Sequence, residues 1–173
     1  TCSIANVMAS RMKMISDKAE FYFITCEPGE DIYARFGHTG LRICDSTIGI
    51  DLVAHWGLFS FETPNFVGKF ILGETDYQMG IFETKYFLQE YVNRGSSVYA
   101  QQLNLTYEQK KELWLKLWEN YKPENRTYRY NFIYNNCATR PFHLILSILS
   151  QDGKIKNEIA KITYRDIINS YIS

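Results

Sequence analysis

The alternation of apolar and polar residues near the start of the chain is typical of β-strands. Residues 21–26 (FYFITC) form a short aromatic and β-branched run, and residues 39–44 alternate apolar and polar side chains. Residues 28–31 (PGED) and 45–49 (DSTIG) are rich in turn-forming residues, and residues 51–61 (DLVAHWGLFSF) form a third apolar run. Because the runs follow one another across turn signals, the pattern predicts a meander of three antiparallel strands.

The middle of the chain mixes two periods. Residues 74–83 and 96–105 have the character of strands, and they flank a helical pattern around Lys85–Val92. We therefore expect two further strands with a helix between them.

The clearest helical pattern covers residues 106–121 (TYEQKKELWLKLWENY). Thr106 followed by Gln109 matches a capping box, which marks the start of a helix. Large apolar residues fall on one face of this helix, namely Leu113, Trp114, Leu117, Trp118 and Tyr121. We interpret this face as core rather than as a cofactor site.

The last third of the chain predicts another helix around Phe142–Leu149, which is strongly apolar. A tail rich in lysine and isoleucine follows, with a second capping pattern from Thr163 to Asp166. The chain shows no internal repeat and no low-complexity segment. We expect one α+β domain over residues 1–173, with helices packed on an antiparallel sheet.

Composition narrows the classes of function. A hydrophobic share of 46% and an aromatic share of 16% are typical of a globular protein and exclude a disordered chain. The 19 basic residues balance the 19 acidic residues, so no basic surplus is available for a nucleic acid. The longest apolar run, at residues 144–149, is much shorter than the roughly 18 residues that a membrane span requires. The sequence therefore predicts a soluble domain that does not bind nucleic acid.

The four cysteines, at positions 2, 26, 44 and 137, show no C-x-x-C spacing. This spacing argues against a zinc knuckle and against a thioredoxin-like redox pair. A domain of this size does not need a disulfide framework, although one bridge could join two of Cys2, Cys26 and Cys44. We expect no cofactor.

Cys137 lies in the segment YNNCATRPF, residues 134–142, just before the last predicted helix. A thiol at a helix N-terminus faces unpaired amides and the positive end of the helix dipole, which favour the thiolate. Asn135 or Asn136 could cap the first turn, and nearby amides could hold an oxyanion. Pro141 cannot bond to the Cys137 carbonyl, so either the first turn is irregular or the regular helix begins later. The alternative is a buried structural cysteine.

A nucleophilic cysteine needs a base, and the chain offers three histidines. His38 lies where a glycine-marked loop enters a strand, and pairing across residues 45–49 would place it opposite positions 54–56. His55 would then be its neighbour and could orient its ring. His143 is expected to be exposed or structural. A metal site from His38, His55 and Cys137 is disfavoured, because these residues have no standard ligand spacing.

Three segments carry a resemblance to a known family: ITCEPGEDIYARFGHTGLRI (24–43), FETPNFVGKFILGETDYQMG (61–80) and PENRTYRYNFIYNNCATRP (123–141). Together they resemble the Lnb N-terminal periplasmic domain family, which is frequent in Bacteroidetes. The resemblance runs in order over about residues 21–171, and the paired motifs FGHT and NNCATRP are its most specific part.

The resemblance implies a fold similar to circularly permuted papain-like enzymes of the NlpC type, in which the histidine strand precedes the cysteine helix. It implies Cys137 as nucleophile, His38 as its base and a location in the periplasm or cell envelope. The family favours asparagine at position 55, where this chain has His55 before Trp56 and Gly57. The role of His55 as a third catalytic residue is therefore left open.

The activity implied is cysteine-dependent acyl transfer, as in a lipoprotein N-acyltransferase. A thiol hydrolase, such as a peptidoglycan amidase or endopeptidase, and a papain-like binding module without catalysis are the alternatives. The implied substrate is a lipid-modified protein or a cell-wall peptide. The enzyme is expected to be a monomer that acts near a membrane surface.

Several residues around the two motifs are candidates for substrate binding. Tyr33, Arg35 and Arg140 could bind a phosphate or a carboxylate, and Asn136 and Tyr134 adjoin the cysteine. For each charge or phenol the alternative is an ordinary surface or packing role. A dry cleft that favours an acyl chain would be lined by residues such as Phe36, Trp56, Phe59 or Tyr134.

Overall fold

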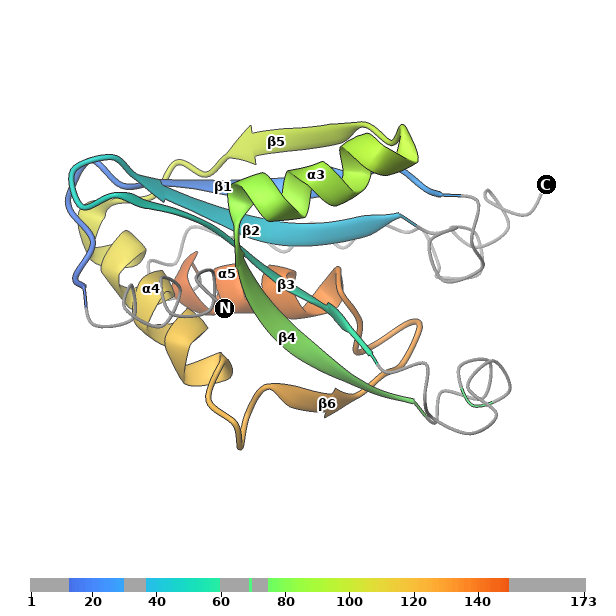
Figure 1. The fold of residues 1–173 in the computed structure, drawn as a ribbon. Coiled ribbons are helices and arrows are strands. Elements are labelled where there is room, and N and C mark those ends of the chain that lie inside the picture. Colours follow the sequence, from blue (N-terminus) through green and yellow to red (C-terminus); the bar gives the residue numbers. More distant parts are fainter. Residues whose placement is uncertain (1–12, 30–36, 60–68, 70–74, 150–173) are drawn as a thin grey trace, which may run out of the picture.

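The structure is a computed structural model, and it describes residues 13–29, 37–59, 69 and 75–149. One antiparallel sheet contains six strands in the order β5-β1-β2-β3-β4-β6 (Figure 1). The strands are β1 (Glu20–Cys26), β2 (His38–Asp45), β3 (Ile50–Leu58), β4 (Asp76–Glu83), β5 (Val98–Gln102) and β6 (Thr127–Arg129). The helices are α3 (Thr84–Arg94), α4 (Tyr107–Asn120) and α5 (Thr139–Leu149). The predicted α+β class with helices on an antiparallel sheet is confirmed.

The predicted three-strand meander is present. β1 pairs with β2 and β2 pairs with β3, with Phe21 opposite Ile43 and Ile43 opposite Leu52. β4 extends the sheet beyond β3, and β5 pairs with the free edge of β1. The short edge strand β6 was not predicted, because three residues are too few to show a period of two.

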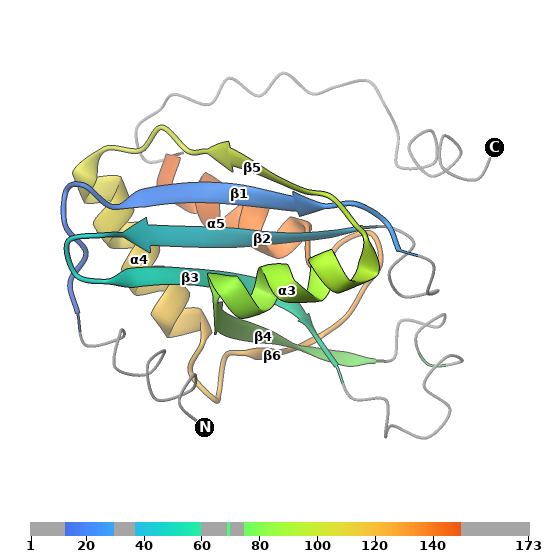
Figure 2. The ribbon, with the colours of Figure 1, turned by 45° about the horizontal axis from the view of Figure 1, so that its top comes forward.

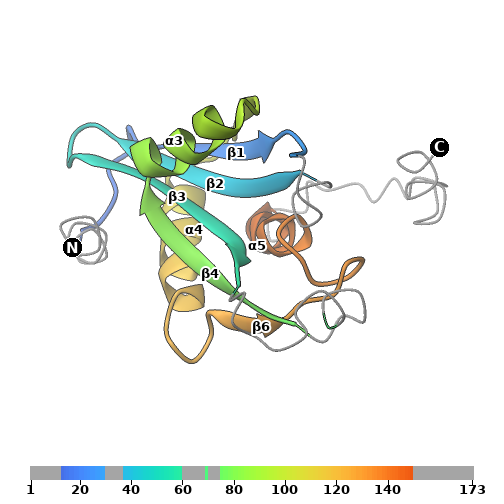
Figure 3. The same ribbon diagram turned by 45° about the vertical axis from the view of Figure 1, so that its right-hand side comes forward.

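Helices cover both faces of the sheet. α3 lies on one face, and α4 and α5 lie on the other (Figures 2 and 3). Successive side chains of a strand point to opposite faces, so β2 sends Leu41 and Ile43 toward α4 and α5. On β1, Ile24 and Cys26 point toward α3 instead. The larger core lies on the α4 and α5 side, and a smaller cluster lies beneath α3.

The capping box predicted for the long helix is present in α4. Gln109 N donates to Thr106 Oγ1 at 3.3 Å, and Thr106 N donates to Gln109 Oε1 at 2.8 Å. Its apolar face enters the larger core as predicted, with Leu113, Trp114, Leu117 and Trp118 buried. Burial of these four side chains contributes on the order of 1.5–3 kcal/mol each, and it fixes the layer in which α5 also lies.

α5 begins at Thr139, three residues earlier than predicted, and buries Pro141, Ile145 and Ile148. The tail with the Thr163–Asp166 capping pattern lies outside the described residues. None of the helices in the described ranges is both long and apolar enough to cross a membrane.

Candidate functional site

The turn before α5 is fixed by a contact with the start of β2. Pro141 has no N–H, so the Cys137 carbonyl lacks the partner that a regular helix would supply. The Thr39 hydroxyl donates to that carbonyl at 2.5 Å. Cys137 is thereby held against the first residues of β2, where His38 also lies.

Asn136 caps the turn, as one of the two alternatives predicted. Its Oδ1 accepts from the amides of Ala138 and Thr139, both at 2.9 Å, and its Nδ2 donates to Phe132 O at 2.6 Å. Both polar ends of the Asn136 side chain are therefore used inside the protein. The contacts describe a structural role for Asn136 in this turn, and its part in substrate binding stays a prediction.

Arg140 is also built into this turn. Its Nε donates to Asn135 Oδ1 at 2.8 Å, and its guanidinium lies 4.0 Å from the centre of the Tyr128 ring. Asn135 Nδ2 in turn donates to Arg129 O at 2.8 Å. Arg140 thus ties the loop before Cys137 to β6, and burial lowers the pKa of its guanidinium.

His38 and His55 are in direct contact. The Nε2 atom of His38 lies 2.9 Å from Nδ1 of His55, and the two rings meet edge to face. The neighbour relation predicted from the sequence is present, although the register differs, because His55 is paired with Gly40 rather than with His38. The contact is therefore diagonal across the β2–β3 ladder.

Gly57 makes room for the His38 ring. A Cβ atom at position 57 would lie 2.4 Å from Cε1 and 3.0 Å from Nε2 of His38. No side chain larger than hydrogen is compatible with this ring position. The segment His55-Trp56-Gly57 therefore supplies a hydrogen-bond partner and a space for the same imidazole.

Both histidines are held neutral by their surroundings. Burial, together with the positive charge of Arg94, lowers the pKa of His38 to about 4. Burial, together with His38, lowers the pKa of His55 well below its usual range, and its ring lies 5.4 Å from the rings of Phe82 and Phe87. At neutral pH the pair can accept a proton and carries no charge.

The Cys137 thiol departs from the sequence-based expectation. Burial raises its pKa, while the amides of Thr39, Cys137 and Ala138 act in the opposite direction. The expected net lowering by the helix N-terminus is wrong, because desolvation outweighs the amides. The resting thiol is protonated, and it makes no direct hydrogen bond with His38.

The His38 imidazole and the Cys137 thiol reach the start of β2 from different faces of the sheet. His38 is paired with Cys26 and points to the α3 side, whereas Thr39, the next residue, points to the side of α5. The β2–β3 ladder ends at Gly40 and His55, so the first residues of β2 have no strand partner on that side. The amide of Thr39 consequently faces the sulfur of Cys137.

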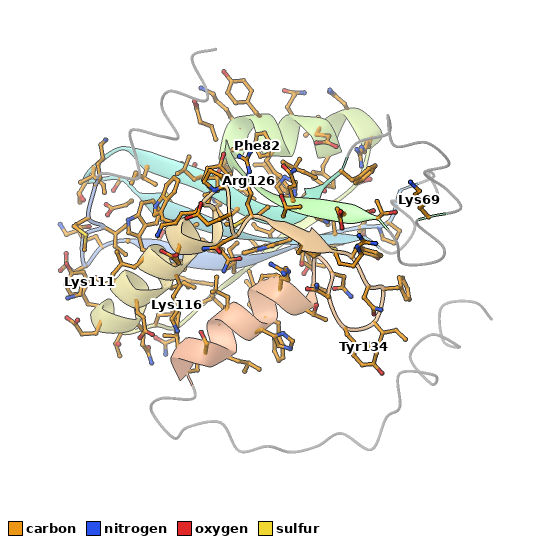
Figure 4. All side chains as sticks on the ribbon, turned by 90° about the horizontal axis from the view of Figure 1, so that it is seen from below. Lys69, Phe82, Lys111, Lys116, Arg126 and Tyr134 are labelled. Carbon is orange, nitrogen blue, oxygen red and sulfur yellow. The ribbon has the colours of Figure 1, made fainter. Side chains whose placement is uncertain are left out.

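The other residues predicted for the site do not gather around Cys137 and His38 in the described structure. Tyr33, Arg35 and Phe36 lie outside the described residues. Tyr134 is 67% exposed and projects outward from the loop before α5 (Figure 4). Trp56 is buried in the core and cannot line a cleft, which corrects that expectation, and Phe59 stacks on Tyr77.

His143 is exposed, as expected. Cys26 and Cys44 are free thiols and form no bridge with each other; Cys2 lies outside the described residues. No cluster of three metal-ligating side chains occurs in the part of the chain that the structure describes.

Three residues of this site were missed by sequence reasoning: Thr39, Gly57 and Arg94. Thr39 belongs to the FGHT motif, so its position beside His38 was a usable signal. Gly57 follows His55 at a spacing that places it on the same face of the strand, which was also visible in the sequence. Arg94 lies on α3, more than fifty residues after His38 in the chain, and no local sequence pattern points to it.

Comparison with known proteins identifies the chain at the level of its family. Neither the curated proteins nor the solved structures include a match to it. A family model does match, over residues 8–170, and the family is described as a periplasmic domain, which places the chain in the periplasm or cell envelope. The chain belongs to the Lnb N-terminal periplasmic domain family.

Proposed function

We propose that this domain is a cysteine-dependent acyl-transfer enzyme of the cell envelope, with Cys137 as nucleophile, His38 as general base and His55 as the residue that orients His38. The observation that carries the proposal is the Thr39–Cys137 hydrogen bond, because it holds the thiol beside the strand that carries the paired histidines. A strand histidine followed later in the chain by a cysteine before a helix also fits a circularly permuted papain-like fold.

The hydrogen-bond partners of the His38 ring nitrogens support a general-base mechanism. His38 Nε2 contacts His55, and its Nδ1 has no hydrogen-bond partner among the described residues. If Nε2–H donates to His55 Nδ1, then Nδ1 of His38 is the free acceptor. A neutral imidazole takes the proton of a neutral thiol only as the sulfur attacks. Because the two groups reach the start of β2 from different faces, they must close to hydrogen-bond distance when substrate binds.

The reaction then proceeds in two balanced steps. The Cys137 sulfur attacks an ester or amide carbonyl while its proton moves to His38, and collapse of the tetrahedral intermediate expels an alcohol or amine that takes this proton back. A thioester on Cys137 remains. In the second step an acceptor amine or water loses a proton to His38, attacks the thioester and releases Cys137 as the thiolate, which regains the proton.

The amide of Cys137 is the better candidate for the oxyanion. The amide of Ala138 already donates to Asn136 Oδ1, whereas the Cys137 amide has no hydrogen-bonded acceptor oxygen in the described structure. An amide that is directed toward the reacting sulfur and otherwise unused can donate to the developing charge.

The acceptor decides the class of enzyme. An amine acceptor makes the protein an N-acyltransferase, and water makes it a hydrolase such as a peptidoglycan amidase or endopeptidase. A binding module is the rival class, and the raised pKa of the Cys137 thiol is the observation in its favour.

The proposal is tested with an activated ester such as 4-nitrophenyl butyrate. We expect a burst of nitrophenol and a butyryl adduct on Cys137, located by mass spectrometry and removed by hydroxylamine. The burst should vanish in Cys137→Ala and slow by about a hundredfold or more in His38→Ala. Absence of any adduct, or acylation that does not depend on His38, would support the binding module. Adding a peptide with a free amino group then separates transfer from hydrolysis.

A further inference from the structure

α3 aligns three side chains on the face that contacts His55. Phe87, Tyr91 and Arg94 have the spacing i, i+4 and i+7, so they lie on one face of the helix. The Phe87 ring is 5.4 Å from that of His55 and 5.0 Å from that of Tyr91. Tyr91 packs in the same buried cluster as Cys26, which is the strand partner of His38. The next position on this face, one turn further along, belongs to Arg94.

Two contacts hold the Arg94 guanidinium in place. Its Nη2 atom donates to Glu90 Oε1, and its central carbon lies 5.6 Å from the centre of the Tyr91 ring. The Arg94 side chain is only one-third exposed. A guanidinium keeps its charge at any physiological pH, so the end of this face of α3 carries a fixed positive charge.

Among the described residues, the elements packed around His38 bring one ion pair near it, formed by Glu90 and Arg94 of α3. β1 contributes the thiol of Cys26, β3 contributes His55, the turn before α5 contributes Cys137, and α3 contributes the phenol of Tyr91, Glu90 and Arg94. Burial keeps the thiols and the phenol uncharged, because it raises their pKa. Glu90 is paired with Arg94 and is more exposed than it. Of these two charges among the described residues, Arg94 is the one that lowers the pKa of His38, and the more exposed Glu90 opposes it.

We propose that Arg94 is a positioning residue whose fixed charge keeps His38 in its unprotonated, proton-accepting form. A cation near an imidazole disfavours a second positive charge, and partial burial lengthens the range of this effect. The residue acts through His38 and contacts no reacting atom. The effect of Arg94 on catalysis rests on the proposed function, but the protonation of His38 can be measured without any reaction.

The test is an NMR titration of the histidine ring signals in the Cys137→Ala background, with the His38 signal identified by its loss in His38→Asn. In Arg94→Gln the midpoint of His38 should rise by about half a pH unit or more, whereas Arg94→Lys should keep it near the parent value. Glu90→Gln, which removes the opposing charge, should lower it.

Arg42→Gln is the matched control. Arg42 is also paired with a carboxylate, Asp51, and also lies over a tyrosine ring, at 5.7 Å from the centre of Tyr22. It is on the same strand as His38 but four residues away, which is about 13 Å along a strand and beyond the screening length at 0.1 M salt. Its loss should leave the His38 midpoint unchanged.

An unchanged midpoint in Arg94→Gln, or equal shifts in Arg94→Gln and Arg42→Gln, would overturn the inference. The ester burst in the otherwise unaltered protein separates this failure from a failure of the proposed function. A normal burst with no titration shift refutes the role of Arg94 alone. A shift in the titration with no burst supports the role of Arg94 on His38 and refutes catalysis.

Discussion

The Thr39 hydroxyl donates to the Cys137 carbonyl at 2.5 Å and joins residues 98 positions apart in the chain. The carbonyl needs this donor because Pro141, four residues further on, has no N–H. The missing N–H of Pro141 in the cysteine motif is thus compensated by the Thr39 hydroxyl of the histidine motif. This hydrogen bond brings the two motifs together.

Thr39→Val should separate the two motifs. Valine keeps the shape of threonine but removes the donor, so the Cys137 carbonyl loses its partner at a cost of about 1–3 kcal/mol in the free energy of unfolding. We expect lower stability in urea denaturation and a slower acylation of Cys137.

Thr39→Ser is the control for this substitution, because serine keeps the hydroxyl and should retain most of the stability and acylation rate. Equal behaviour of the valine and serine variants would show that the hydrogen bond does not hold the site.

Gly57→Ala should displace the His38 ring. The added methyl group would lie 2.4 Å from Cε1 of His38, so the imidazole must move and its contact with His55 must break. We expect the acylation rate to fall by about tenfold or more, since small misplacements of a catalytic base are costly.

Gly49→Ala controls for a general loss of stability. Its Cβ would meet no atom within 4 Å, but its φ of 67° makes alanine unfavourable by roughly 1 kcal/mol. It should lower stability and leave the acylation rate of the folded protein unchanged. If Gly57→Ala acylates as fast as Gly49→Ala, the ring position is not required.

Sequence patterns predicted the strands of the meander and the helix that carries its own capping box. β2 and α4 show why, because the alternation around Leu41 and the Thr106–Gln109 pair depend on neighbours in the chain. The approximate contact of His38 with His55 was also predictable, since one short turn joins their strands.

The electrostatics of the site were not predictable in the same way. The pKa of Cys137 depends on how deeply the turn before α5 is buried, and desolvation reverses the sign expected from the helix N-terminus. The environment of His38 depends on Arg94, which α3 brings in from a distant part of the chain. The sequence made Arg140 a candidate for binding a phosphate or a carboxylate, but its guanidinium lies over the Tyr128 ring and secures a loop.

The histidine pair should make the stability of the protein depend on pH. The pKa of His38 is about 4 in the folded protein and about 6.5 when unfolded, so between these values the unfolded chain binds more protons. Stability should therefore fall as the pH falls from about 6.5 to 4. His55 acts in the same direction, because its pKa is also lowered. Urea denaturation at a series of pH values measures this slope.

The variant His38→Asn, His55→Asn should flatten the slope in that window. Asp45 and Asp51 also have lowered pKa values, but their effect appears only at lower pH, below about 4. His143→Asn, which removes an exposed histidine outside the pair, is the matched control, and the flattening in the double variant should exceed any change that it causes. If the double variant keeps the pH dependence of stability seen in the parent protein, the histidine pair is not held neutral.

Alkylation should distinguish the cysteines and show that the resting site is a neutral pair. Burial raises the pKa of the Cys137 thiol, so its reaction with iodoacetamide should increase with pH through a midpoint above the free-thiol value of about 8.5. Cys26, buried with a pKa of about 11, should react more slowly than Cys137 at every pH. Mass spectrometry of timed samples gives both rates. Rapid labelling of Cys137 near pH 6 would instead mean that a thiolate is already formed against an imidazolium, and the general-base step proposed for His38 would have to be replaced by attack from an ion pair.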